Sequence, residues 1–364
     1  MGRRGRRPDF ERLRHVLLRQ GSPGPVPPIE FLADVALMEQ VVGEPFPIES
    51  LADLKSCGEV ECKRACDLII RFHEQLGYDY VSVLVEVPLD SAYTGVDDTG
   101  GGGKRYWQDQ SRGPIGSWAD FDAYRWPAPG DINYRALEYT AGHLPEGMKA
   151  IAVCDGVFEW AKAMMGLETF SFALMDDPDL VAAVCQRVGE LTAAACQNAV
   201  KTPNVGALFV SDDMGYFTAT LISPKHLRKY IFPWEKRLAE VAHTGGVPFL
   251  LHACGNVSAV MDDLIDGVGI DGKHSYEDKI KPVEKVMETW GDRISVLGGV
   301  DMDILARGTE QQVRERVRQI LDFCGPRGGY CLGTGNTAAN YLPVANLLAM
   351  LDEGERWNKA HFGQ

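Results

Sequence analysis

Short, strongly apolar runs recur along the chain, and none of them alternates cleanly between apolar and polar positions. Runs of this kind, rich in Val, Ile, Leu and Phe, are typical of parallel strands that are covered on both faces. We therefore expect eight buried strands, at residues 26–31, 78–87, 148–155, 207–213, 248–255, 267–273, 294–301 and 330–335.

Stretches with apolar residues at three- and four-residue spacing lie between most of these runs and predict helices. The clearest stretch spans 177–200. Another helix is expected to start at Ser223 and Pro224, because a serine hydroxyl accepts hydrogen bonds from the free N–H groups of a first turn and proline fits there. Further helices are predicted at 257–266, 282–290, 309–323 and 343–354.

The alternation of eight strands with helices predicts an α/β fold, a single (β/α)8 TIM barrel. An open, doubly wound sheet is the alternative, because periodicity does not reveal whether a sheet closes. No glycine-rich dinucleotide turn follows an early strand; the glycines at 100–103 lie in a polar segment that we expect to be a mobile loop over a site. We expect one domain, with an N-terminal extension and helix at 1–20 and the barrel at 21–360.

Composition narrows the range of partners. The 364 residues include 37 Lys and Arg against 51 Asp and Glu, a formal charge of −14, whereas nucleic-acid binding needs a basic surface. No apolar run approaches the roughly 18–20 residues of a membrane span. Nine cysteines without paired spacing indicate a reducing compartment, so we expect a cytoplasmic protein that binds neither nucleic acid nor membrane.

Polar side chains stand where the predicted strands end. In a parallel barrel the carboxyl ends of all strands share one face, and that face carries the chemistry. Any one of these residues can instead cap a helix, but the pattern recurs over five or six strands. The residues are Asp155, Asp212, Asp213, His252, Cys254, His274, Asp301 and Asn336.

The sharpest local signal is the run HACGN at 252–256. In an extended chain, residues two apart point the same way, so the imidazole of His252 and the thiol of Cys254 can meet one ion. Nitrogen and sulfur are a matched pair for Zn²⁺, which takes about four ligands. A buried cysteine beside a histidine that bonds a backbone carbonyl is the alternative. The missing ligands are sought among acids at other strand ends, namely Asp212, Asp213 and Glu86.

Four segments of the chain resemble the uroporphyrinogen decarboxylase-like superfamily, at 211–238, 248–275, 294–309 and 329–354. The resemblance implies a single-domain (β/α)8 barrel, in agreement with the strand count. Two kinds of enzyme share that fold in the superfamily. True uroporphyrinogen decarboxylases need no cofactor, and zinc-dependent methyltransferases act together with corrinoid proteins.

The resemblance is closer to the methyltransferase branch. True decarboxylases carry an N-terminal Arg-rich motif close to RQAGRYLPEY, and no such run occurs here. The methyltransferases bind zinc through His-x-Cys, which matches His252 and Cys254, and through a later Cys near the last strand. Asn336 stands about where that cysteine would be. The resemblance therefore implies either that Asp213, Glu86 or another oxygen donor completes the zinc site, or that the metal is bound more weakly or is missing.

The implied reaction moves a methyl group between a small methoxy or thiol-type substrate and a corrinoid, which a transient partner protein carries. Asp213 and Asp155 would orient the substrate, and His274 would donate a proton or support His252. Trp107 would line an apolar wall, and a homodimer is consistent with some members of the superfamily. Substrate contacts are expected from Asp212, Tyr216, Phe217, Asp301 and Asn336.

Two other functions stay open at this point. One is cofactor-free decarboxylation of a porphyrinogen-like or smaller acid, which an arginine-rich cavity would support, with Arg105, Arg112 and Arg125 as its candidates. The other is a non-catalytic binding barrel, in which replacing His252 or Cys254 would leave ligand binding unchanged.

Overall fold

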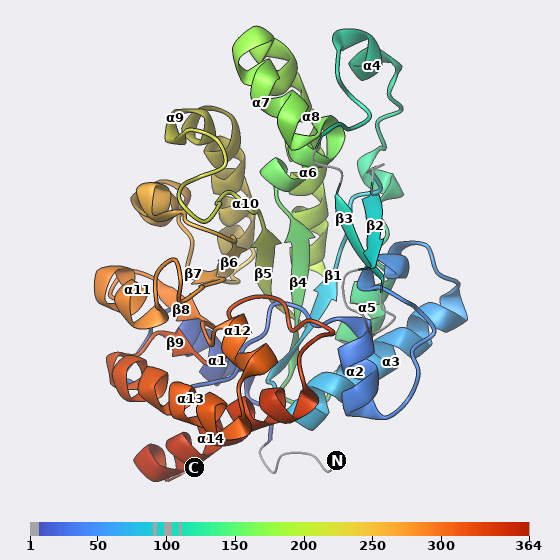
Figure 1. Ribbon diagram of the computed structural model, residues 1–364. Coiled ribbons are helices and arrows are strands. Elements are labelled where there is room, and N and C mark those ends of the chain that lie inside the picture. The colour runs from blue at the N-terminus through green and yellow to red at the C-terminus, as the bar shows by residue number, and fades with distance from the viewer. Residues whose placement is uncertain (1–6, 90–92, 98–103, 109–110, 364) are drawn as a thin grey trace.

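The computed structural model describes residues 7–89, 93–97, 104–108 and 111–363. At its centre lies an α/β core whose sheet of seven parallel strands curves into a half-barrel (Figure 1). The strands follow one another in chain order across the sheet. Because they all run parallel, their carboxyl ends gather at one edge. In sheet order the strands are β1 (Tyr80–Leu84), β4 (Lys149–Asp155), β5 (Val205–Ser211), β6 (Phe249–His252), β7 (Gly272–His274), β8 (Ser295–Leu297) and β9 (Tyr330–Cys331).

Helices connect successive strands and cover the sheet (Figure 1). In the part of the chain that the structure describes, no helix is long and apolar enough to cross a membrane. The α-helices are α1 (Phe10–Leu17), α2 (Val35–Val42), α3 (Glu59–Leu76), α4 (Trp118–Ala123), α5 (Arg135–Gly142), α6 (Val157–Met165), α7 (Leu167–Asp176), α8 (Pro178–Lys201), α9 (Pro224–His226), α10 (Phe232–Thr244), α11 (Val283–Trp290), α12 (Met302–Arg307), α13 (Glu310–Cys324) and α14 (Val344–Phe362).

Short 3₁₀ and π segments complete the helical elements. They are η1 (Leu51–Lys55), η2 (Pro129–Asp131), η3 (Leu227–Ile231), η4 (Ser258–Val260), η5 (Asp263–Val268) and η6 (Gly325–Arg327). Two of the predicted helices are irregular. The segments η4 and η5 make up most of 257–266, and the helix predicted to start at Ser223 is divided into α9 and α10 by the π segment η3. Those predicted at 177–200, 282–290, 309–323 and 343–354 are α8, α11, α13 and α14.

Helix starts follow the capping chemistry read from the sequence. The Ser223 side chain accepts a hydrogen bond from the His226 N–H, as expected at that position. Asp177 does the same for Leu180 at the start of α8. These side chains satisfy N–H groups that have no partner inside a first helical turn.

The predicted first strand, 26–31, is only partly a strand. An isolated parallel bridge joins Pro28 to Leu332, just after β9. Prolines at 25, 27 and 28 remove the N–H groups that a longer ladder needs. Among the described residues, no backbone ladder joins this segment to β1; the Tyr80 hydroxyl of β1 bonds the backbone of Glu30 instead. The parallel sheet is therefore confirmed, and closure into an eight-stranded barrel stays a prediction.

The polar segment that was expected to be a loop contains an antiparallel hairpin, β2 (Tyr93–Asp97) with β3 (Lys104–Gln108). The loop interpretation was wrong for residues 94–97 and 104–108, because the Thr, Val, Tyr and Trp residues beside the glycines favour extended backbone. Residues 100–103 and the side chain of Trp107 lie outside the described part of the chain. Their predicted roles, as a lid and an apolar wall, stay predictions, as does the domain division at residue 20.

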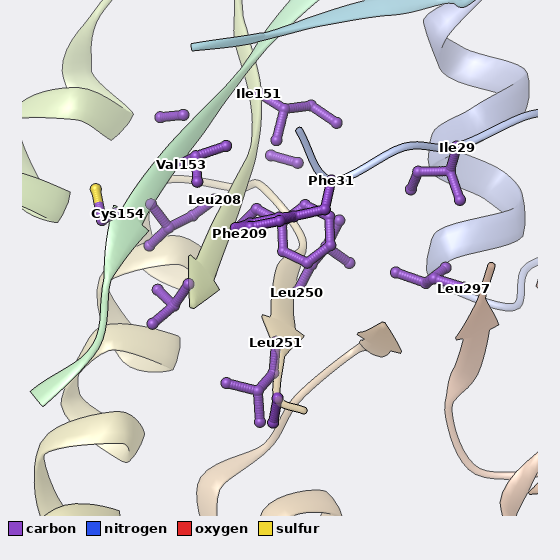
Figure 2. Packing of buried hydrophobic residues seen from close by; sticks show 14 of the residues in the cluster. Ile29, Phe31, Ile151, Val153, Cys154, Leu208, Phe209, Leu250, Leu251 and Leu297 are labelled. Carbon is purple, nitrogen blue, oxygen red and sulfur yellow. The ribbon is translucent and has the colours of Figure 1, made fainter. Parts of the chain in front are cut away.

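The core links the N-terminal segment to the middle of the sheet. Phe31 lies with its ring centroid 4.9 Å from that of Phe209 in β5, in an edge-to-face contact. Figure 2 shows Phe31 among Leu250, Ile151 and other apolar side chains that the strands send inward. Aromatic pairs of this geometry add to the stabilisation from buried area alone. The N-terminal segment is thereby fixed against the sheet without a long strand of its own.

Glu30, next to Phe31, is buried beneath the end of β9. Its Oε1 accepts a hydrogen bond from the Thr334 N–H at 3.0 Å, and its Oε2 lies 2.6 Å from the Thr334 hydroxyl oxygen. Burial raises the pKa of Glu30 to about 8, although both contacts with Thr334 act in the opposite direction. The carboxyl is therefore protonated in the folded protein at neutral pH.

A Glu30→Gln substitution is expected to remove a pH dependence of stability. Between about pH 4.5 and 8 the folded state keeps a proton on Glu30 that the unfolded chain has lost, so stability falls as the pH rises through this window. One proton corresponds to a slope of about 1.4 kcal/mol per pH unit. Urea unfolding at pH 5.5, 6.5 and 7.5 should give a flatter dependence for the variant. Parallel curves for the two proteins would contradict the prediction.

Candidate functional site

The candidate site lies at the carboxyl edge of the sheet, where β5, β6 and β7 end side by side. Ser211 is paired in register with His252, and His252 with His274. Asp213 follows two residues after Ser211, and Cys254 two residues after His252. The parallel register thus brings together residues that are far apart in the sequence, as the strand-end pattern predicted.

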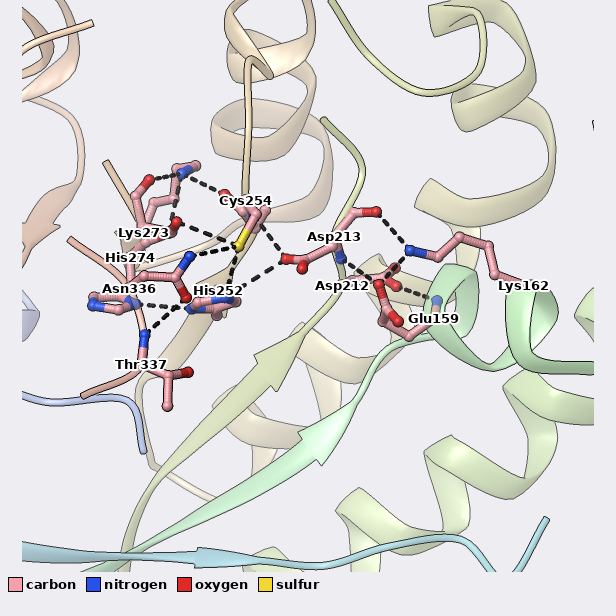
Figure 3. A network of polar contacts seen from close by, with 12 residues as sticks. Glu159, Lys162, Asp212, Asp213, His252, Cys254, Lys273, His274, Asn336 and Thr337 are labelled. Carbon is pink, nitrogen blue, oxygen red and sulfur yellow. Dashed lines mark hydrogen bonds and ion pairs between the residues drawn. The ribbon is translucent and has the colours of Figure 1, made fainter. Parts of the chain in front are cut away.

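Three side chains converge at this edge (Figure 3). The Nε2 atom of His252 lies 3.2 Å from the Sγ atom of Cys254 and 3.6 Å from Oδ1 of Asp213. One ligand atom from each of the three residues lies within 4.8 Å of the others. Imidazole nitrogen, thiol sulfur and carboxylate oxygen are all zinc ligands, so the donor set fits a zinc ion.

Hydrogen bonds assign the tautomer of His252. The Nε2 atom of His274 lies 3.1 Å from the Thr334 carbonyl oxygen, so this nitrogen carries a proton and donates it. Burial, then the neighbouring His252 and Lys273, hold the pKa of His274 well below its usual value, and its Nδ1 therefore keeps a lone pair. The Nδ1 atom of His252 lies 2.8 Å from the Nδ1 atom of His274 and must donate a proton to its lone pair. The Nε2 lone pair of His252 is then free to face Cys254 and Asp213.

The imidazole of His252 is neutral and held from several sides. Burial lowers the pKa of His252 to about 4, although Asp213 acts in the opposite direction. The ring stacks on Phe31, with centroids 4.3 Å apart and an interplanar angle of 19°. The sequence offered no signal for this contact, because Phe31 comes from the N-terminal segment.

The sulfur of Cys254 accepts two hydrogen bonds. Asn336 donates from Nδ2 at 3.3 Å, and the Ser275 hydroxyl donates at 3.5 Å. The backbone N–H of Cys254 donates to Oδ1 of Asp213 at 2.7 Å. Burial raises the pKa of the Cys254 thiol, and the nearby Asp213 raises it further. Asn336 thus contacts the sulfur directly, although sequence reasoning assigned it to the substrate.

Asp213 is ionised despite its surroundings. Burial alone would raise the pKa of Asp213, but His252, Lys162 and the Cys254 N–H together lower it below its usual value. Lys162 lies nearby, where its ammonium donates to the Asp213 carbonyl oxygen at 3.0 Å and pairs with Glu159.

Two glycines let the loops that carry Asp213 and Cys254 meet. Gly255 has φ +74°, and a Cβ atom there would lie 2.4 Å from the backbone carbon of Gly215. A Cβ atom on Gly215 would lie 2.6 Å from the Cys254 carbonyl oxygen. Backbone hydrogen bonds from Gly215 to Cys254 and from Asn256 to Tyr216 join the two loops. Only glycine allows this close crossing.

Glu86, the other acid proposed as a metal ligand, does not belong to this group. Its carboxylate pairs with Lys55 of η1 at 2.8 Å, and Asp213 is the acid that converges with His252 and Cys254.

Asp155 ends β4, beside Ser211. Burial raises the pKa of Asp155 well above its usual value, and Glu86 is the largest of the neighbouring acids that add to this effect.

The residues predicted to contact a substrate lie in different settings. Asp301 caps α12 by accepting from Asp303, and its other oxygen accepts from the Asp278 N–H. Tyr216 and Phe217 are 66% and 51% exposed on the loop that follows β5, at the edge where the side chains of Asp213, His252 and Cys254 converge. They are available to a ligand or a partner.

Asp212 is fully buried, on the opposite side of its strand from Asp213. Its carboxylate accepts the N–H groups of Phe158 and Glu159 at 3.2 and 2.7 Å, in the first turn of α6. Burial, and then Glu235 and Glu159, raise the pKa of Asp212 well above its usual value. No surface of Asp212 is open to a substrate in this structure, and its interactions are those of a helix cap.

Comparison with known proteins places the chain in a family. The family model described as uroporphyrinogen decarboxylase (URO-D) matches residues 63–357, which is more than half of the chain. The chain therefore belongs to the uroporphyrinogen decarboxylase family, and the resemblance seen in the sequence is confirmed.

Two curated relatives match part of the chain. The methylcobamide:CoM methyltransferase MtbA of Methanosarcina acetivorans is 26% identical over 137 residues, 36% of this chain and 37% of that protein. A uroporphyrinogen decarboxylase of Syntrophotalea carbinolica is 26% identical over 146 residues, 40% of each chain. The matched segments thus span about two fifths of either relative. The two relatives are enzymes of different kinds.

One solved structure is similar over nearly the whole length. A methyltransferase from Methanosarcina mazei superposes with a TM-score of 0.71 and 17% identity, covering 95% of this chain and 98% of that one. At this identity the likeness shows the fold alone.

An Asp212→Ala substitution is expected to destabilise the protein by about 1–2 kcal/mol, because two N–H groups of the first turn of α6 lose their acceptor. Asp212→Asn keeps an acceptor oxygen and should therefore destabilise the protein less than Asp212→Ala. Urea unfolding of the three proteins measures both effects. Equal losses for the two variants, or none for Asp212→Ala, would show that the carboxyl does not act as a cap.

Proposed function

We propose that this protein is a zinc-dependent methyltransferase that moves a methyl group between a small methylated compound and a corrinoid carried by a partner protein. The observation that carries the proposal is the convergence of the His252 lone pair, the Cys254 sulfur and the Asp213 carboxylate on one point. Membership of a family whose relatives include a methylcobamide:CoM methyltransferase supports the reaction class.

In the proposed site, His252, Cys254 and Asp213 hold the zinc ion. Three protein ligands leave a fourth position for a substrate, the arrangement of catalytic rather than structural zinc sites. A bound zinc ion supplies Lewis acidity, which activates a thiol or makes a methoxy oxygen a better leaving group. Both uses are compatible with the same three ligands, so the proposal covers thiol and methoxy substrates.

Hydrogen bonds from the surrounding residues orient these ligands and set their protonation states. His274 accepts the Nδ1 proton of His252 and so keeps Nε2 available, the support that metal-binding histidines receive from a second hydrogen bond. Ser275 and Asn336 donate to the Cys254 sulfur, which favours its anionic form. Asp213 is oriented by the Cys254 N–H.

Asp155 is proposed as the proton donor of the site. It ends the strand beside β5, and burial together with the neighbouring acids raises its pKa, which favours the protonated carboxyl. A group of this kind can protonate a leaving oxygen or retain a proton while a thiolate forms. Tyr216 and Phe217 are proposed to contact the substrate or the corrinoid protein, because both rings are exposed beside the ligands.

Decarboxylation is the second candidate, because one curated relative is a uroporphyrinogen decarboxylase. That reaction would need cationic groups to hold the substrate's carboxylates. Arg112 and Arg125 are exposed rather than gathered in a cavity, and the side chain of Arg105 lies outside the described residues.

The purified protein is expected to bind about one zinc ion per chain, and Cys254→Ala or His252→Ala should reduce this to near zero, because two protein ligands hold zinc poorly. Elemental analysis after dialysis measures the metal content. Cys57→Ser is the matched control, since Cys57 is the other partly exposed cysteine and lies outside the site. A wild-type protein that stays zinc-free after loading would remove the basis of the proposal.

Methyl transfer is tested with methylcobalamin, which replaces the corrinoid protein, and coenzyme M as the thiol. Loss of the methylcobalamin absorption in the presence of zinc-loaded protein is the expected result, and Cys254→Ala should lower the rate by at least about 100-fold. Release of carbon dioxide from uroporphyrinogen, unaffected by a zinc chelator, would favour the decarboxylase instead.

A further inference from the structure

Lys273 is a buried lysine directly behind the candidate site, and the function proposed above gives it no task. It lies in β7, one residue before His274, and only 2% of it is exposed. Its ammonium donates to three backbone carbonyl oxygens, those of Ala253 at 2.9 Å, His274 at 3.0 Å and Ser275 at 2.8 Å. All three N–H donors of the side chain are thereby used.

The charge of Lys273 has no direct counter-ion. Among the described residues, no carboxylate forms an ion pair with its ammonium, and the remaining close contact is the ring of Tyr276, 4.4 Å away. Burial lowers the pKa of Lys273 to about 8, so the charged form still predominates at pH 7. A buried charge without a carboxylate partner is costly. Three carbonyl dipoles only partly offset that cost.

The three carbonyls belong to the two segments that surround the Cys254 sulfur. Ala253 lies between His252 and Cys254 at the end of β6, and Ser275 donates to the sulfur from the end of β7. The ammonium of Lys273 therefore ties together the backbone of the metal-binding loop and the backbone of the residue that contacts its thiol (Figure 3).

Ser275, whose carbonyl oxygen is one of the three acceptors, has an unusual backbone conformation. Its φ of +80° lies in the left-handed region, which residues with a side chain seldom adopt. Such a conformation persists only where the surroundings impose it. In this conformation the Ser275 carbonyl accepts the hydrogen bond from Lys273, and the Ser275 hydroxyl donates to the Cys254 sulfur.

We propose that Lys273 is a positioning residue for the metal centre. By binding the carbonyls of Ala253, His274 and Ser275, it holds Ser275 against the Cys254 sulfur. It also places a positive charge behind a ligand set that contains a thiolate and a carboxylate. The part of this inference that concerns metal affinity rests on the proposed function. The part that concerns the conformation of Ser275 does not.

The first test is the structure of metal-free Lys273→Gln and Lys273→Met at crystallographic resolution. Loss of the anchoring bonds should let Ser275 leave the left-handed region, and its hydroxyl should move beyond 4 Å from the Cys254 sulfur. Lys273→Gln retains donors for one or two of the carbonyls, so it keeps the test usable where Lys273→Met fails to fold. Ser275 and Cys254 unmoved in a folded variant would overturn the proposal.

The second test is titration with Co²⁺, in which a thiolate-to-cobalt absorption band reports the Cys254 bond. Both Lys273 variants should bind Co²⁺ about 10–100-fold more weakly than wild type, the loss typical of removing support behind a ligand, and their band should shift. Lys281→Met is the matched control, because Lys281 contacts the Trp290 ring rather than the site. The Co²⁺ affinity and the absorption band of this control should match those of the wild-type protein.

The two tests separate the hypotheses. Wild-type affinity and an unshifted band in a folded Lys273 variant would overturn the role of Lys273 while leaving zinc binding intact. A wild-type protein without affinity for Co²⁺ or Zn²⁺ would overturn the proposed function and the metal-related part of the inference. The conformation of Ser275 in the metal-free variants would still decide whether Lys273 positions it.

Discussion

The hydrogen bond between the Nδ1 atoms of His252 and His274 is the contact on which the candidate site depends. It exists because β6 and β7 run parallel with these two residues in register. A shift of one residue would send one ring to the other face of the sheet. The bond also decides which nitrogen of His252 faces Cys254, so strand pairing sets the chemistry of a ring at the end of the strand.

Much of the fold and part of the site follow from the sequence. Buried apolar runs predicted the seven strands of the sheet, and the spacing of His252 and Cys254 correctly placed both side chains on one side of β6. Periodicity did not reveal that prolines reduce the first predicted strand to a single bridge. It also gave no sign of a hairpin inside a polar, glycine-rich segment.

The choice among the acids could not be made from sequence. Glu86 and Asp213 both follow strands, and only the fold shows that Lys55 from a separate turn neutralises the first. Asp212 and Asp213 are neighbours of identical chemistry, but alternation along the chain sends one into the start of α6 and the other toward the ligands. The contact of Phe31 with the His252 ring depends on packing between distant segments, which local pattern does not encode.

The crossing of the loops at Gly215 and Gly255 has an evolutionary consequence. Because each glycine makes room for the other loop's backbone, neither loop can gain a side chain or change length at that point on its own. Accepted changes in the two loops are therefore expected to be coupled, because a larger residue in one loop requires the backbone of the other to move.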